Sequence, residues 1–169
     1  MTARVLHFFP TPVIIDELEG AEDLNRELEP AIVDQRQRDS GLKLSNRGGW
    51  QSKRDFPQWG GDAGKRIIEH AVRLASENTG HAPNRSYVRA GEGEGGQLVL
   101  HDPRMPALRM HAPGLRFKDA GPDVRTTIEP KSGLMVLFPA WLLHSVEPWQ
   151  GDGHRISVAM NIRASMARR

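Results

Sequence analysis

The stretch that decides the fold is residues 128–162, IEPKSGLMVLFPAWLLHSVEPWQGDGHRISVAMNI. Its continuous apolar run, Leu134–Phe138, predicts a strand that is buried on both faces, and Pro139 ends that run. A second strand is predicted at 142–146 and a third, with alternating polar and apolar residues, at 154–162. Proline and glycine separate these segments, so the stretch predicts consecutive short strands joined by turns.

The last two of these strands bring three polar side chains together in a predicted hairpin. If its turn centres near residues 149–151, His144 lies opposite Arg155 to within about one residue, and opposed side chains start roughly 5 Å apart. Alternation places Ser157 on the same face as Arg155. We therefore expect an imidazole, a guanidinium and a hydroxyl group to project into one interior.

These three side chains have a chemical use in combination. A neutral imidazole is a ligand for Fe(II), and a guanidinium in apolar surroundings binds a carboxylate through two hydrogen bonds. A dicarboxylic oxoacid could therefore chelate a metal ion beside His144 and form a salt bridge with Arg155. Two simpler interpretations stay open. His144 can be an ordinary core histidine, and Arg155 can pair with Glu147 or Asp152 at the surface.

The first half of the chain has helical patterns. Apolar residues recur at helical spacing over 21–38 and over 63–79. Pro30 lies inside the first of these segments, which predicts a kink or two short helices. Before them, the proline-bearing segment 5–15 is expected to form an edge strand.

The second half of the chain has short strands separated by glycine and proline, and further strands are predicted at 87–90, 97–101 and 125–128. We expect one domain, 1–169, with an N-terminal helical portion, 1–80, and a β core, 87–164. The predicted fold class is therefore mainly β with flanking helices.

Composition narrows the kind of site. The chain of 169 residues has no cysteine, which excludes disulfides, thiolate metal sites and a cysteine nucleophile. Its formal net charge is only +2 and no run of like charges occurs, so no nucleic-acid partner is expected. No apolar run is long enough to span a membrane. We expect a cytoplasmic protein, and the edge strand at the N-terminus is compatible with a homodimer.

Several segments together resemble a known family. Pro139–Pro148 followed by Arg155–Asn161 is similar to the end of the core in bacterial 2-oxoglutarate/Fe(II)-dependent oxygenases of a prolyl-hydroxylase-like branch. Ser45–Ser52, Gly96–Arg104 and Phe9–Val13 resemble further parts of that group, in the same order along the chain. The resemblance implies a double-stranded β-helix, that is, a jelly-roll or cupin-like core.

The resemblance also implies an activity and roles for residues. The activity is the oxidative decarboxylation of 2-oxoglutarate coupled to hydroxylation of an unknown substrate, a small molecule or a peptide. Its cofactors are Fe(II) and 2-oxoglutarate. His144 corresponds to an iron ligand, Arg155 to the residue that binds the co-substrate carboxylate, and Ser157 to its helper.

The chain departs from the family in its metal ligands. Such enzymes place a histidine two residues from an acidic residue or second histidine, and none of the 7 histidines here has such a neighbour. The family carries that motif before a strand resembling Tyr87–Gly91, so we predict that about 25–30 residues are absent near Ser86. Either the sequence omits a segment within 84–88 or the protein has lost it. Two neighbouring Cα atoms in 84–88 much farther apart than about 3.8 Å would show a missing segment, whereas a continuous chain there would contradict the prediction.

Two other functions are consistent with the same residues. One is a non-catalytic jelly-roll that keeps the carboxylate pocket and binds small acids without iron. The other is a cupin-type isomerase with the same fold and a different site. Loss of 2-oxoglutarate binding on replacement of Arg155 favours the oxygenase over the isomerase.

Overall fold

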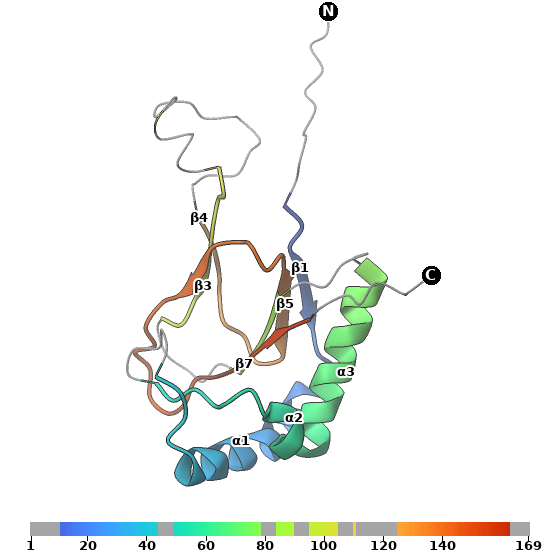
Figure 1. The fold of residues 1–169 in the computed structure, drawn as a ribbon, viewed down its shortest axis with the longest axis vertical. Helices are drawn as coiled ribbons and strands as arrows, with labels where there is room; N and C mark the ends of the chain where they lie inside the picture. Colours follow the sequence, from blue (N-terminus) through green and yellow to red (C-terminus); the bar gives the residue numbers. More distant parts are fainter. Residues whose placement is uncertain are drawn as a thin grey trace, which may run out of the picture.

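A computed structural model describes residues 11–43, 49–78, 84–89, 95–104, 110 and 125–162, with 84–89 described by their backbone (Figure 1). In chain order the elements are β1 (Ile14–Glu17), α1 (Ala21–Arg38), α2 (Phe56–Trp59), α3 (Gly61–Asn78), β2 (Asn84–Arg89), β3 (Leu98–His101), β4 (Arg125–Ile128), β5 (Leu134–Phe138), β6 (His144–Val146) and β7 (Ile156–Asn161). Within these ranges no helix is both long enough and apolar enough to cross a membrane.

The strands form two antiparallel sheets. The four-stranded sheet has the order β1-β5-β2-β7, and the three-stranded sheet has the order β4-β3-β6. In the first sheet Val136 of β5 is paired with Ile15 of β1 and with Ser86 of β2. In the second sheet Leu98 of β3 is paired with Ile128 of β4 and Val146 of β6. Strands distant in sequence are therefore neighbours in both sheets.

Strand β5 is buried throughout because it has a layer of protein on each side. Met135 and Leu137 face the helices, where they join Leu24 of α1 and Ile67 of α3 in one core. The alternate residues of β5 face the three-stranded sheet and form a second core there. Its buried members are Leu98, Leu100, Leu134, Val136, Phe138 and Leu142. The four-stranded sheet thus lies between the helices and the second sheet (Figure 1).

Helix α1 follows Gly20, whose φ of 69° is in the left-handed region that glycine adopts readily. It has acidic residues in its first turn and basic residues in its last, which complement the helix dipole. Pro30 lies inside it, yet Ala21–Arg38 is a single helix rather than two short ones. Burial of Leu24 and Leu28, one turn apart, holds the helix on the sheet and offsets the lost backbone hydrogen bond.

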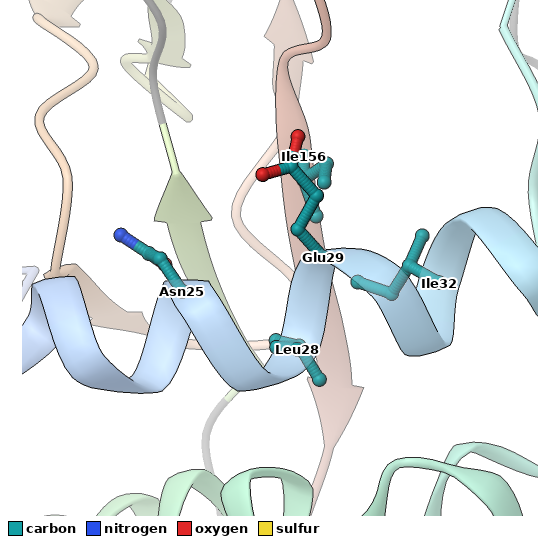
Figure 2. Close-up of a pocket in the computed structure, with 5 residues that line it drawn as sticks. All are labelled: Asn25, Leu28, Glu29, Ile32 and Ile156. Atoms are coloured by element: carbon teal, nitrogen blue, oxygen red, sulfur yellow. The ribbon is translucent and has the colours of Figure 1, made fainter.

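A small pocket separates α1 from the beginning of β7 (Figure 2). Asn25 at its edge is largely buried and donates a hydrogen bond of 2.6 Å from Nδ2 to Ser132 Oγ. The other lining residues are Leu28, Glu29, Ile32 and Ile156. Because Ile156 alternates with Ser157 along β7, this pocket lies on the helix side of the sheet and the polar face of β7 lies on the other side.

The structure confirms much of the predicted element order and corrects two details. Strands β4 and β5 and helix α1 coincide with the predicted segments 125–128, 134–138 and 21–38. The N-terminal strand does not span 5–15: within the described residues it is β1, Ile14–Glu17, and residues 1–10 lie outside the described part of the chain.

The second correction concerns the predicted hairpin. Strands β6 and β7 do not pair with each other, because β6 pairs with β3 in one sheet and β7 with β2 in the other. The segment between them crosses from one sheet to the other. Its first residues continue the ladder with β3, since Trp149 bridges Gly95 and Glu147 N–H donates to the Gln97 carbonyl at 3.0 Å.

The backbone near Ser86 belongs to one strand. Asn84–Arg89 forms β2 with unbroken register to both β5 and β7, so the structure contains no chain break within 84–88. That the protein has lost two strands relative to its family stays a prediction. In the described residues the two sheets are not joined into a closed jelly-roll.

Candidate functional site

Arg155 lies immediately before β7, and its side chain reaches across to the other sheet. A Cβ placed on Gly96 would lie 2.6 Å from both Cδ and Nε of Arg155 and 3.3 Å from Cε3 of Trp149. No Cβ fits at such distances, and the φ of Gly96, 72°, also favours glycine. Gly96 therefore provides the surface on which the Arg155 side chain rests, with Trp149 beside it.

The guanidinium of Arg155 is a cation without a counter-charge in the described structure. Its Nε is shielded from solvent and has no hydrogen-bond partner there. Burial alone lowers the pKa of Arg155 from its ordinary value, whereas a neighbouring carboxylate would raise it. The predicted alternative, a surface pair with Glu147 or Asp152, is therefore not seen: both of those side chains are exposed. Such a group is suited to receive an anion from outside the chain.

His144 begins β6 and has a fixed orientation although the residue is exposed. Its ring packs edge-on against Phe138, with ring centroids 4.9 Å apart. Nδ1 lies 2.8 Å from the Leu142 carbonyl, and because a carbonyl only accepts, Nδ1 carries the proton and donates. In the neutral ring Nε2 then has the free lone pair. This is the tautomer in which an imidazole ligates a metal through Nε2.

Strand pairing shows which face His144 occupies. His144 is paired with Leu100, and paired residues of a sheet project from the same face. Leu100 and Leu98 belong to the core between the sheets, so His144 faces that space too. Gly96, on which the Arg155 side chain rests, precedes β3 and has a φ of 72°, so the side-chain alternation of β3 does not extend to it.

Ser157 lies two residues beyond Arg155, on the exposed face of β7. Its neighbours Ile156 and Val158 are buried, and Val158 packs in the core under the helices. Alternation therefore turns Ser157 toward the three-stranded sheet, the side that His144 also faces. His144 and Ser157 thus lie on the faces that the two sheets turn toward each other, although no hairpin joins their strands.

The described part of the chain contains no cluster of three His, Asp or Glu side chains able to hold a metal ion. His101, which neighbours the paired Leu100, lies on the opposite face from His144 and contacts Ser145 Oγ at 3.3 Å. Asp102 is occupied by Arg104, whose NH2 lies 2.6 Å from Oδ2. Among these described residues, His144 has an imidazole nitrogen without a protein partner, and Arg155 has a guanidinium without a counter-charge.

The sequence patterns do not predict that Gly96 and Trp149 belong to this site. The pattern at 91–96 indicates an acidic hairpin turn, and a lone tryptophan such as Trp149 indicates packing, but Gly96 and Trp149 both adjoin Arg155. The paired glycines at 95 and 96 are the available signal, because adjacent glycines within a strand pattern mark a close approach of another chain segment. Which segment approaches is not encoded locally.

Comparison with known proteins indicates the family of the chain. A family model described as "Putative 2OG-Fe(II) oxygenase" matches residues 77–161, just over half of the chain. The match extends from the end of α3 through β7 and so includes His144, Arg155 and Ser157. A search of curated proteins found no match to this sequence. On the extent of the family match, the chain belongs to this 2-oxoglutarate/Fe(II) oxygenase family.

Proposed function

We propose that this chain is a 2-oxoglutarate- and Fe(II)-dependent dioxygenase that hydroxylates a small-molecule or peptide substrate. In such a reaction O2 delivers one oxygen atom to the substrate C–H bond and the other to the carboxylate of succinate, with release of CO2 from 2-oxoglutarate. The family match supports this reaction class. We further propose that the two sheets belong to a jelly-roll of the prolyl-hydroxylase-like branch.

The observation that carries the proposal is the guanidinium of Arg155, whose Nε is buried and unpaired among the described residues, beside Gly96 at the start of the segment that leads into β3, the partner strand of His144. Arg155 binds the distal carboxylate of 2-oxoglutarate, and the hydroxyl group of Ser157 donates a further hydrogen bond. A carboxylate supplies the counter-charge that the described polypeptide lacks at this position. The aliphatic part of the Arg155 side chain rests on Gly96 and holds the guanidinium in position before the ligand binds.

His144 is the proposed iron ligand at the other end of the oxoacid. The Leu142 carbonyl fixes its tautomer and the Phe138 ring packs edge-on against it, so Nε2 is the nitrogen left free for a metal ion. Iron bound there would supply the activation of dioxygen. The residues of the chain provide binding, orientation and shielding of the co-substrate from water.

The test is turnover of 2-oxoglutarate by the full chain with Fe(II) and O2, measured as succinate and CO2 formed. We expect slow turnover even without the substrate, and loss of 2-oxoglutarate binding in Arg155→Ala. Arg26→Ala is the matched control, because Arg26 is an exposed helix residue paired with Asp23 at 3.0 Å. Equal binding of 2-oxoglutarate by wild type and Arg155→Ala would contradict the proposal.

One observation favours a second candidate, a non-catalytic module that binds small acids. Within the described ranges the carboxylate end has its binding group, whereas the metal end offers one ligand, His144. Calorimetry with Fe(II) and 2-oxoglutarate separates the two functions. Tight binding of the oxoacid without measurable affinity for Fe(II) would identify the module and exclude the dioxygenase.

A further inference from the structure

A second buried donor lies beside Arg155 and has no role in the function proposed above. The indole Nε1 of Trp149 is shielded from solvent and lacks a hydrogen-bond partner, as does Nε of Arg155. These are the two buried side-chain donors without a partner in the described part of the chain. An unpaired buried N–H group costs about 1–3 kcal/mol, so two in one place indicate a ligand that supplies the acceptors.

Both side chains lie near the same point of the backbone. Cδ and Nε of Arg155 lie 2.6 Å from the position of a Cβ on Gly96, and ring atom Cε3 of Trp149 lies 3.3 Å from it. Trp149 is fixed there by its backbone bridge to Gly95, where a Cβ would lie 2.1 Å from the Pro148 carbonyl oxygen. Two consecutive glycines thus allow a tryptophan and an arginine to pack against one strand.

The indole N–H groups of the other described tryptophans either have an acceptor or are exposed to water. Trp50 Nε1 donates to the Asp39 carbonyl at 2.8 Å, and Trp59 Nε1 donates to Asp55 Oδ1 at 2.9 Å. Trp141 is 63% exposed, so water is available to its indole. Within the described ranges, Trp149 is therefore the indole whose N–H is buried and unpaired, and it lies where Arg155 has no counter-charge.

We propose that Trp149 is a positioning and specificity residue for the co-substrate: its indole N–H donates to the same carboxylate that Arg155 binds. This inference rests on the proposed function and adds a second donor to that end of the site. An indole N–H can only donate and a guanidinium can only donate. The two donors therefore bind a carboxylate, in which both oxygen atoms accept hydrogen bonds. They bind an amide less well, because its NH2 group is itself a donor and accepts none.

The experiment follows the four indole N–H signals of the 15N-labelled full chain by NMR, assigned by single Trp→Phe substitutions. The probes are 2-oxoglutarate, glutarate, which lacks the oxo group, and glutaramide, its neutral analogue. We expect the Trp149 indole proton to shift downfield with both diacids and to stay in place with glutaramide. The signals of Trp50 and Trp59, which already have acceptors, should not move.

Binding measurements complete the test. Trp149→Phe keeps an aromatic ring and removes the donor, and we expect its affinity for 2-oxoglutarate to fall by about tenfold or more, the effect of one hydrogen bond to a charged group. Trp141→Phe, at an exposed position, should bind as wild type does. Thermal melting confirms that each variant is folded, and the shift in the wild-type protein needs no variant.

The outcomes separate the inference from the function on which it rests. If 2-oxoglutarate binds through Arg155 while the Trp149 signal stays still and Trp149→Phe binds normally, the inference is overturned and the dioxygenase proposal stands. If the Trp149 signal shifts with glutarate but the chain never forms succinate, the carboxylate subsite stands and the dioxygenase proposal fails. A shift of equal size with glutaramide would also overturn the inference.

Discussion

At the Arg155 end of the candidate site the side chains of Arg155 and Trp149 are half-buried, with one donor atom of each shielded from solvent, whereas the His144 end lies on an exposed edge strand. At the first end the described chain keeps two buried donors unpaired and uses glycine at position 96 to make room for them. At the second end a single exposed imidazole is oriented by one carbonyl and one ring. Unpaired buried donors cost stability, so the two ends differ in what they contribute to the free energy of unfolding.

Arg155→Met should give the largest effect and in two opposite directions. Loss of the guanidinium should weaken 2-oxoglutarate binding by at least about 100-fold, because a buried charge-assisted pair is worth several kcal/mol. Without ligand, the variant should be more stable than wild type, since a half-buried cation without a counter-charge among the described residues is removed. Calorimetry and urea denaturation measure the two quantities. A variant that is less stable and binds normally would show that Arg155 is structural.

Gly96→Ala tests whether the contact between Gly96 and the Arg155 side chain is needed for binding of 2-oxoglutarate. The new Cβ would lie 2.6 Å from the Arg155 side chain, and the displaced guanidinium should bind 2-oxoglutarate about tenfold more weakly. Gly153→Ala is the matched control: its φ of 81° brings similar backbone strain, of about 1–2 kcal/mol, but a Cβ there meets nothing within 4 Å. Equal losses of affinity in both variants would remove Gly96 from the site.

His144→Ala examines the other end of the comparison. Because His144 is exposed and its hydrogen bond is local, we expect the free energy of unfolding to change by less than about 1 kcal/mol. Succinate formation should be lost, while binding of glutarate, which needs no metal, should be retained. A strong loss of glutarate affinity would mean that the two ends are not separate.

Ser157→Ala should have the smallest effect. One hydroxyl group contributes about 0.5–1.5 kcal/mol, so 2-oxoglutarate affinity should fall about two- to tenfold. Ala159 shows that a methyl group is tolerated on the same exposed face of β7, so the fold should be unaffected. No change in affinity would remove Ser157 from the carboxylate site and leave Arg155 with Trp149.

The helices, the central strand and the chemistry of their side chains follow from local patterns in the sequence. Helical spacing predicts Ala21–Arg38, and a continuous apolar run predicts the buried strand Leu134–Phe138. These signals are local, because a helix or strand shows its period within its own residues. The residue types at 144 and 155 likewise indicate a metal ligand and a carboxylate-binding group from the sequence alone.

Strand pairing and the surroundings of Arg155 depend instead on the three-dimensional fold. Side-chain alternation says which residues share a face of a strand but not which strand lies beside it, so it predicts a hairpin of β6 and β7 although they belong to different sheets. The contact of Arg155 with Gly96 joins residues far apart in sequence and depends on that pairing. The unpaired indole of Trp149 likewise becomes visible only when the possible acceptors around it have positions in space.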